Sequence, residues 1–578
     1  MSADEVGDIL EQIALLLELK GENPFKIRAY TNAARALETL TDDLARLVEE
    51  KRLEEIDGIG KAIAEKITTL VTTGKLEYYD TLREEFPPDI FTLFELQGLG
   101  AKKIKLLYEK LGIHSLTKLE RACRDGSVAA LPGFGEKTAD NILKALEQHK
   151  KNAGQFRLGS ITILAEELLD DLRSHPRVTL VQIAGSYRRK KEFVRDLDFI
   201  VSTRQPAAVS ADFVNHPLVE SVLAHGETKS SVVLKNGIQC DLRVVSSGEY
   251  PFALNYFTGS KEHNVKMRSR ALERGWSLNE YRFSEAEGRK LKEPIPAVQT
   301  EADLYKALGL DYIEPELRED RGEIAAAENG ELPRLIEWPN LRGTFHCHTT
   351  ASDGRASLEV MADAARELGL QYLGIADHSK SSVQANGLDE KRLLAQVAEI
   401  KKLNEDQEKF RIFSGSECDI KKDGSLDFSD EILGQLDYVV ASVHASFTLS
   451  ETEMTDRIIK AMQNPHVTML GHLTGRLLLT REPYKVNIPA IIEAAAATGT
   501  IIELNANSRR LDMDWRWWPL AKEKGVKCAI NPDAHSTAGL QDLIFGIQIA
   551  RKGWLTKADV VNTLPLGKIE KVLAARIS

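Results

Sequence analysis

The sequence has 578 residues, 43% of them hydrophobic and 28% charged, a composition typical of a folded globular protein, and its length predicts about four domains. No apolar run approaches the roughly 20 residues of a membrane span, and the five scattered cysteines favour free thiols in a reducing cytoplasm over a disulfide framework. The net charge of −11 means that nucleic-acid binding would need local basic patches and backbone amides rather than overall charge.

The N-terminal region has helical periodicity and an internal repeat. The pattern apolar-x-x-apolar-x-Gly-apolar-Gly occurs three times, and each copy precedes a lysine and a helical pattern. This is the helix-hairpin-helix pattern, in which glycines let the backbone approach a DNA phosphate and the next helix presents its N-terminal N–H groups. The alternative is a plain helical hairpin with a glycine C-cap. The predicted DNA-binding residues are Gly58, Gly60, Lys61, Gly98, Gly100, Lys102, Gly133, Gly135 and Lys137.

A Gly-Ser turn and two arginines, in the segment GSYRR at 185–189, follow an apolar strand. The next strand contains Asp196 and Asp198, whose side chains point the same way because strand residues alternate faces. A further strand near 238–244 supplies Asp241. Like charges this close favour a divalent metal, and two metals clamped by three carboxylates suit phosphoryl transfer. The bland alternative is an ordinary strand–turn–helix with surface acids.

These segments, GSYRR, RDLD and CDLRV, resemble the palm of the family X DNA polymerases. The resemblance implies that Ser186 and Arg189 bind the triphosphate. It also implies that Asp196, Asp198 and Asp241 are catalytic metal ligands, with Asp241 as the base for the primer 3′-hydroxyl.

The segment YFTGSKEHNVKMR at 256–268 resembles the thumb helix of the same family. The match implies that Tyr256, Phe257 and Gly259 belong to the nucleotide site, and that Asn264 reaches the minor-groove edge of the incoming base. Arg268 would contact the template strand, and Arg243 would support the catalytic acids.

The segments NPFKIRAY and GIGKAIAEKI near the N-terminus resemble the small lyase domain found in this family. Lys66 matches its Schiff-base lysine, and Lys26 and Tyr30 match part of its 5′-phosphate pocket. Ala62 and Phe25 replace two other pocket residues, which argues against lyase activity. Lys66 is therefore predicted first as a phosphate contact, since an unperturbed lysine is a poor nucleophile at neutral pH.

From residue 340 onward, short apolar strands alternate with amphipathic helices, as in parallel α/β units. Seven strands are predicted, and metal-ligand residue types or an asparagine follow each one. A barrel of such units gathers the C-terminal ends of its strands, so these residues should converge in one cleft. A lone histidine behind a strand is usually structural, but a recurring pattern favours a metal centre.

This half resembles the PHP (polymerase and histidinol phosphatase) domain, a distorted seven-stranded barrel that holds up to three metals. The resemblance implies as metal ligands His346, His348, Asp353, His378, Glu417, His444, His472, Asp533 and His535. Asp377 would support a neighbouring ligand. Arg509 and Arg510, which follow the sixth strand, are candidates for a phosphate clamp, with a surface role as the equal alternative. The mixed imidazole and carboxylate set fits Mn²⁺, Zn²⁺ or Fe²⁺.

The predicted fold is a multidomain α/β protein: an all-α helix-hairpin-helix region, an α+β nucleotidyltransferase palm with a thumb, and a C-terminal distorted (β/α)7 barrel of PHP type. The expected domains are a lyase-like helical domain (1–82), fingers (83–154), palm (155–247), thumb (248–317), an acidic solvated linker (318–339) and the PHP domain (340–578).

Together the resemblances imply a family X DNA polymerase with a PHP domain. Such an enzyme would fill gaps in DNA repair, including base excision repair, and would carry a 3′-5′ exonuclease or 3′-end phosphoesterase. Mg²⁺ or Mn²⁺ is expected at the palm, and up to three Mn²⁺, Zn²⁺ or Fe²⁺ ions at the PHP site. The expected partners are gapped or primer-template DNA and dNTPs, for a cytoplasmic monomer that does not bind membranes.

Two alternatives remain open at this stage. In one, the barrel is a small-molecule phosphatase. In the other, the N-terminal half is a non-catalytic DNA-docking module for a PHP nuclease or phosphatase. Three complete palm carboxylates and an intact YFTGS segment disfavour the second reading.

Overall fold

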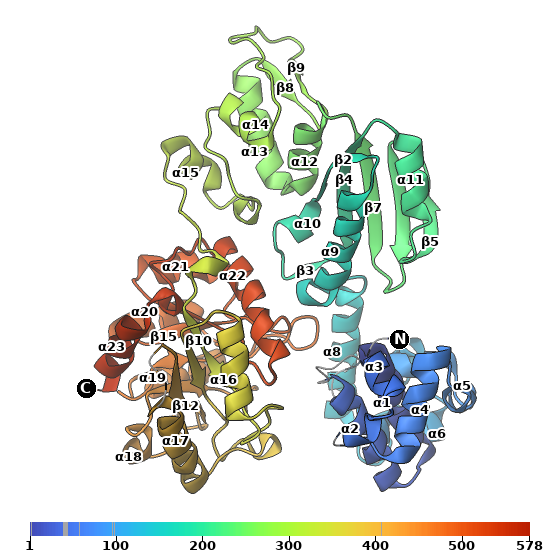
Figure 1. Cartoon of the computed structure of the whole chain (residues 1–578), viewed down its shortest axis with the longest axis vertical. Coiled ribbons are helices and arrows are strands. Elements are labelled where there is room, and N and C mark those ends of the chain that lie inside the picture. Colours follow the sequence, from blue (N-terminus) through green and yellow to red (C-terminus); the bar gives the residue numbers. More distant parts are fainter. Residues whose placement is uncertain are drawn as a thin grey trace. The chain divides into compact units, whose positions relative to one another are not determined.

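The structure is a computed structural model that describes residues 1–578 apart from 2, 39–43, 57, 95, 97–98, 406, 408 and 578. The chain divides into two compact units, residues 1–153 and 154–578 (Figure 1). Among the described residues, none of the helices combines the length and apolar character needed to span a bilayer.

The first unit is built from helices around one apolar core. Its helices are α1 (Ala3–Lys20), α2 (Pro24–Glu38), α3 (Leu44–Glu49), α4 (Lys61–Thr73), α5 (Glu77–Glu84), α6 (Ala101–Leu111), α7 (Leu116–Arg124) and α8 (Glu136–Asn152). Helices α4, α6 and α8 begin directly after Gly60, Gly100 and Gly135, as the repeat predicts.

The second unit begins with a five-stranded sheet of order β2-β4-β7-β6-β5. Its strands are β2 (Val178–Ile183), β4 (Asp196–Thr203), β5 (Val219–Ala224), β6 (Lys229–Leu234) and β7 (Gln239–Val245), and the nearby short strands β1 (Phe156–Arg157) and β3 (Phe193–Val194) pair with each other. Helices α9 (Leu158–Ser174), α10 (Gly185–Arg188) and α11 (Pro206–Val214) complete the region predicted to be the palm.

The two faces of this sheet have different roles because side chains alternate along each strand. Leu197, Phe199 and Val201 share one apolar core with residues of α9 and α11. On the opposite face, Ile200 packs with Ala253 and Leu254 of the thumb. Asp196 and Asp198 lie on this second face, as predicted from the alternation.

The thumb follows the palm. It contains α12 (Tyr250–Thr258), α13 (Lys261–Glu273), β8 (Trp276–Leu278), β9 (Phe283–Glu285), α14 (Glu301–Ala307), the 3-10 turn η3 (Pro315–Leu317) and α15 (Glu323–Asn329). The segment 318–339, expected to be a solvated linker, instead packs against the thumb. Arg318 and Glu323 are fully buried, and Glu323 lies 2.8 Å from Nδ1 of His263. Two of its charged side chains are therefore paired inside the thumb, whereas Glu331, Arg334 and Glu337 are exposed.

The C-terminal part contains a parallel sheet with strand order β10 to β16, whose first and last elements approach each other through a parallel bridge between Cys347 and Ala534. The strands are β10 (Gly343–Cys347), β11 (Tyr372–Ile375), β12 (Arg411–Asp419), β13 (Tyr438–Ser442), β14 (Met469–Leu470), β15 (Ile501–Asn505) and β16 (Cys528–Asn531). The helices are α16 (Leu358–Glu367), α17 (Glu390–Glu405), α18 (Asp430–Leu433), α19 (Glu451–Met462), α20 (Ile488–Thr498), α21 (Trp518–Glu523), α22 (Leu543–Lys552) and α23 (Leu566–Ile577).

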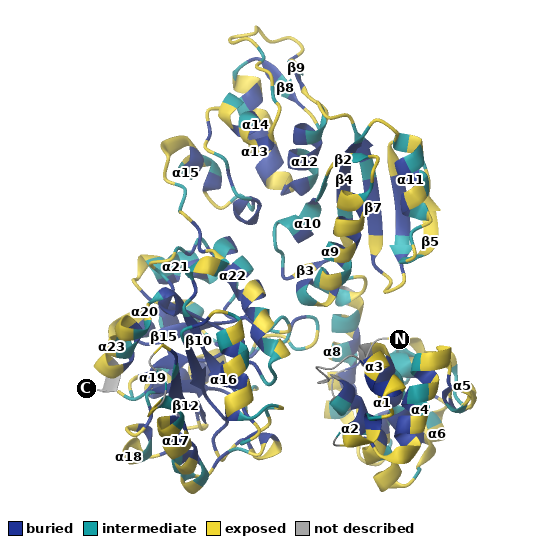
Figure 2. Cartoon of the chain, in the orientation of Figure 1, coloured by how far each residue is buried: buried dark blue, intermediate teal, exposed yellow. Residues whose placement is uncertain are grey.

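The barrel interior is apolar, and aromatic side chains from successive strands fill it. Phe345, Phe413 and Tyr438 belong to one buried cluster, to which α23 adds Ile569 and Leu573. Figure 2 shows the strands as buried and the outer faces of the surrounding helices as exposed. The predicted fold class is confirmed: a helical helix-hairpin-helix region, an α+β palm and thumb, and a seven-stranded parallel barrel.

Candidate active sites

The palm carboxylates lie on two adjacent parallel strands. In the register of β4 and β7, Asp198 is paired with Asp241, and Asp196 with Gln239. Burial raises the pKa of Asp198 to about 6, and the neighbouring Asp196 and Asp241 add to the shift. Burial also raises the pKa of Asp196, with Asp241 as the next cause. The sheet thus gathers like charges, an arrangement that a bound cation would stabilise.

Asp241 has a neutralising partner that the sequence did not single out. Lys229 of β6 lies 2.8 Å from Oδ2 of Asp241, and the Gln239 amide donates to Oδ1 at 3.1 Å. Burial would raise the pKa of Asp241, but the hydrogen bonds from Lys229, Ser231 and Gln239 bring it below its ordinary value.

The Gly-Ser turn lies directly against these acids. Gly185 has φ +63°, and a Cβ atom there would be 2.8 Å from Oδ2 of Asp198, so glycine is required for both conformation and space. Ser186 follows it in α10, and Arg189 comes directly after this helix. The Arg189 guanidinium donates to Glu319 at 3.0 Å and to the Thr258 carbonyl.

The thumb residues predicted to contact the nucleotide are also grouped. Tyr256 and Phe257 are half-buried with their rings edge to face, and Arg243 lies 4.0 Å from the centre of the Phe257 ring. The Asn264 amide donates to the Tyr256 carbonyl at 2.7 Å. Gly259 links α12 to α13 and has φ +70°. Arg268 is exposed on α13.

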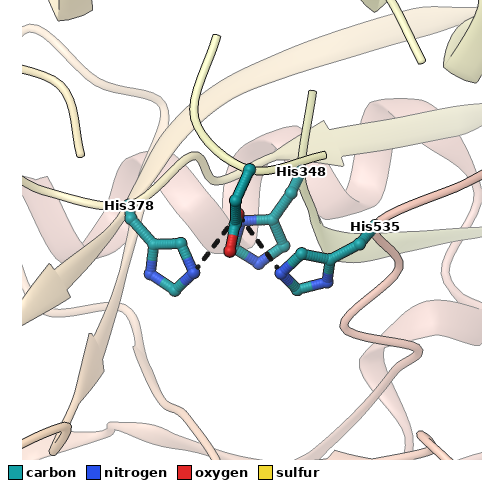
Figure 3. A group of neighbouring side chains, drawn as sticks. His348, His378 and His535 are labelled. Carbon is teal, nitrogen blue, oxygen red and sulfur yellow. Dashed lines mark ion pairs between the residues drawn. The ribbon is translucent and has the colours of Figure 1, made fainter. Parts of the chain in front are cut away.

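The barrel brings all nine predicted ligands to one end. Four overlapping groups have ligand atoms within 4.8 Å of one another: His346, His348 and Asp533; His346, Glu417 and His472; His378, Glu417 and His444; and His348, Asp353, His378 and His535. In the last group, the Asp353 carboxylate lies 3.3 Å from His535 and 3.6 Å from His378. Figure 3 shows the imidazoles of His348, His378 and His535 close together in this group.

Several of these buried atoms have no hydrogen-bond partner, including Nε2 of His346 and of His348 and Oε2 of Glu417. Burial would raise the pKa of Glu417, but His444, His346 and His378 lower it well below its ordinary range. Burial lowers the pKa of His348 to about 4, and the neighbouring His535 and His378 contribute. Burial would lower the pKa of His444 and of His535, but neighbouring carboxylates raise it to about 10 and about 9. Buried imidazoles and carboxylates packed together, with unpartnered donor atoms, form the kind of ligand set that a divalent metal binds. The residues present therefore fit a multinuclear metal centre.

Comparison with known proteins identifies the family. The chain is 39% identical to the DNA polymerase/3′-5′ exonuclease PolX of Bacillus subtilis (strain 168) over 575 residues, which cover 99% of each protein. The chain belongs to the family X DNA polymerases with a PHP domain. Models of four families match: a helix-hairpin-helix domain (1–76), a SAM-like helix-hairpin-helix tandem (91–148), the DNA polymerase beta thumb (253–319) and the PHP domain (344–507).

Two further relatives each resemble one part of this family X chain. DNA polymerase lambda of Rattus norvegicus is 26% identical over 342 residues, which cover 54% of the chain and 56% of that protein. A probable phosphatase of Thermoanaerobacter sp. (strain X514) is 30% identical over 240 residues, which cover 39% of the chain and 92% of that protein.

Two carboxylates that the sequence reasoning missed hold the PHP histidines in place. Glu503 is fully buried in β15. Its Oε2 lies 2.5 Å from Nδ1 of His346, and its Oε1 accepts a hydrogen bond from the backbone amide of His472 at 2.9 Å. Asp419 of β12 lies 3.0 Å from Nδ1 of His444. Carboxylates in this position orient a ligating imidazole and make it more basic. For Glu503 the available signal was an acid within the apolar strand β15, but β12 is polar enough that Asp419 gave no such signal.

Asp377, expected to support a neighbouring ligand, instead organises the loop after β10. Its carboxylate accepts from the Thr349 amide at 2.8 Å and from the Thr349 hydroxyl at 2.6 Å. Arg510 does reach the PHP site, with Nε 3.3 Å from Oδ2 of Asp533 and a buried Nη1 that has no partner.

Four of the predicted helix-hairpin-helix glycines face open space, whereas a Cβ atom at Gly58 would lie 3.5 Å from the Asn32 carbonyl oxygen. A Cβ atom at Gly60, Gly100, Gly133 or Gly135 would meet nothing within 4 Å. No side chain caps helices α4, α6 or α8 among the described residues, so their first N–H groups have no such competitor for a phosphate. Gly98 lies outside the described residues. Lys66 donates to the Ala62 carbonyl at 3.1 Å and lies 5.3 Å from the centre of the Tyr78 ring.

Proposed function

We propose that this family X protein is a two-site DNA repair enzyme: the palm adds deoxynucleotides to a primer in short gaps, and the PHP barrel removes nucleotides or blocked ends from a 3′ terminus. The observation that carries the proposal is the presence of two separate ligand clusters, one of three carboxylates on β4 and β7 and one of nine residues in the barrel. Divalent ions held there would polarise phosphate oxygens and lower the pKa of attacking water or hydroxyl groups.

In the palm, Asp196, Asp198 and Asp241 would hold Mg²⁺ or Mn²⁺, which favour oxygen ligands. Asp241 would accept the proton of the primer hydroxyl, and Lys229 at 2.8 Å keeps it ionised for that role. Ser186 and Arg189 would bind the triphosphate, with the N–H groups of the Gly185–Ser186 turn.

The thumb would select the nucleotide. Tyr256, Phe257 and Gly259 would form a wall beside the sugar, and Asn264 would reach the base edge. Arg243 is placed by its contact with the Phe257 ring, so it links this wall to the strand that carries Asp241. Arg268 is exposed and free to reach a template strand.

In the barrel, His346, His348, Asp353, His378, Glu417, His444, His472, Asp533 and His535 would hold Mn²⁺, Zn²⁺ or Fe²⁺. Arg510 would bind the phosphate being cleaved, because its Nε lies 3.3 Å from the ligand Asp533 and its buried Nη1 has no partner. The similarity of this half to a probable phosphatase favours hydrolysis of phosphate esters.

Paired variants of the two sites test the proposal. Asp196→Ala with Asp198→Ala should abolish primer extension on a one-nucleotide gap and leave 3′ degradation intact. His346→Ala with His348→Ala should do the reverse. If either folded double variant loses both activities, the two-site proposal is wrong.

The substrate of the barrel needs a separate assay. Hydrolysis of a 3′-recessed duplex should exceed hydrolysis of a small phosphomonoester, and both should disappear in the histidine double variant. A preference for the small ester would instead identify the barrel as a small-molecule phosphatase.

A further inference from the structure

A lysine of the PHP barrel is buried against the palm turn. Lys552, the last residue of α22, is fully buried. Its ammonium group donates to Glu319 at 2.6 Å and to the Arg189 carbonyl at 2.9 Å, and it lies 4.6 Å from the centre of the Trp515 ring. One barrel side chain therefore reaches the end of the turn that holds the predicted triphosphate ligands.

Glu319 is shared between the barrel lysine and the palm. The oxygen that accepts from Lys552 also accepts from Nε of Arg189 at 3.0 Å, and Lys191 lies 3.5 Å from the other oxygen. Burial would raise the pKa of Glu319, but Lys552, Arg189 and Lys191 lower it to about 2. One carboxylate thus contacts three basic side chains, which fixes its position beside the end of the Gly-Ser turn.

Arg189 is held on both its backbone and its side chain. Lys552 binds its carbonyl, Glu319 binds Nε, and the Thr258 carbonyl accepts from Nη1. A guanidinium binds phosphate through a planar fork, so its orientation decides how well it binds. Without Lys552, both Glu319 and the Arg189 carbonyl would lose a hydrogen-bond partner, and Arg189 would be held less firmly.

We propose that Lys552 of the PHP barrel is a positioning residue for nucleotide binding in the palm, acting through Glu319 and the backbone of Arg189. The inference rests on the proposed role of Arg189 as a triphosphate ligand. It makes the barrel a structural part of the polymerase site in addition to its own chemistry.

The test compares steady-state extension of a one-nucleotide gap by the full-length Lys552→Met variant and the wild type. Loss of a charge-assisted hydrogen bond should raise KM for the dNTP about tenfold, with kcat much less affected. Affinity for the gapped DNA and degradation of a 3′ end should not change. Arg551→Met is the matched control, since Arg551 spans the same interface but contacts Glu316 at 2.6 Å and the Ile336 carbonyl at 3.2 Å.

Glu319→Gln gives an independent variant, which should raise KM in the same way, and adding Lys552→Met to it should produce little further change. The inference is overturned if Arg551→Met raises KM as much as Lys552→Met, or if Lys552→Met leaves KM unchanged while Arg189→Met raises it. If Arg189→Met itself leaves KM unchanged, the proposed triphosphate role of Arg189 fails, and the inference fails with it.

Discussion

At the residue scale, the charge balance of the palm depends on Asp198. Its raised pKa means that the folded chain binds this proton more tightly than the unfolded chain does. The resulting stabilisation is complete below the ordinary carboxyl pKa of about 4 and is lost as pH rises through about 6. At neutral pH without metal, the ionised group therefore costs stability.

Asp198→Asn should accordingly stabilise the metal-free protein at pH 8, by about 2 kcal/mol, and the gain should vanish near pH 4. Thermal unfolding in a chelator, followed across this pH range, measures the effect. Added Mg²⁺ should raise the midpoint of the wild type more than that of the variant. A lower midpoint for the variant at pH 8 would contradict this account.

Glu503 has a comparable importance in the barrel, because it holds His346 through Nδ1 at 2.5 Å. Glu503→Gln should weaken metal affinity roughly 10- to 100-fold and slow 3′ degradation, since the imidazole loses its orienting partner. Metal content after dialysis and the rate of degradation are the measurements. Primer extension should be unaffected.

The matched control for Glu503 is Glu493→Gln on α20, a carboxylate whose only described ion pair is with the exposed Lys524 at 3.7 Å. This variant should retain its metal and its activity. Equal loss of metal in both variants would show that the effect does not come from the contact with His346.

At the element scale, the starts of helices α4 and α6 can be tested separately from folding. Gly60 and Gly100 have ordinary extended backbone angles, and a Cβ atom there meets nothing. Gly60→Ala with Gly100→Ala should therefore leave the unfolding midpoint nearly unchanged, while a phosphate that approaches the backbone would be obstructed.

DNA affinity of this double variant should fall about tenfold. A titration of labelled gapped DNA at several salt concentrations measures the loss. Gly567→Ala is the control, because that glycine also has open space around it but lies on α23 of the barrel. Unchanged DNA affinity in the double variant would favour a plain helical hairpin.

The thumb shows how an element can be misjudged from its composition. Residues 318–339 are rich in charge and suggested a solvated linker, yet Arg318 is fully buried 2.5 Å from Glu301. A charged residue is expected to be exposed unless the fold supplies an oppositely charged partner at a buried position. For Arg318 that partner is Glu301, which lies 17 residues earlier on α14.

At the scale of the whole molecule, two sites with different donors should respond differently to metals. The palm offers carboxylate oxygens alone, whereas the barrel offers buried imidazoles together with carboxylates. Hard Mg²⁺ prefers the first set and Mn²⁺ or Zn²⁺ the second.

After exhaustive chelation, Mg²⁺ alone should restore primer extension but not 3′ degradation, and Mn²⁺ or Zn²⁺ should restore degradation. Both reactions can be followed on the same gapped substrate. Restoration of both activities by Mg²⁺ to the same extent would show that the two sites do not differ in the way their ligands indicate.

The sequence by itself determined the motifs and the order of the folded parts. Local patterns carry this information: alternation places Asp196 and Asp198 on one face, the repeat predicts where α4, α6 and α8 begin, and successive strands each bring ligand-type residues to one end of a barrel. Each pattern is a spacing of residue types along the chain, so it can be read without the fold.

Only the tertiary structure decided the partners of those residues. Glu503 reaches His346 from 157 positions away, Lys229 neutralises Asp241 across a strand pair, and Lys552 meets Arg189 across 363 positions. These contacts depend on how packed elements bring distant side chains together. The sequence spacing of buried charges contains no information about which opposite charge or metal will balance them.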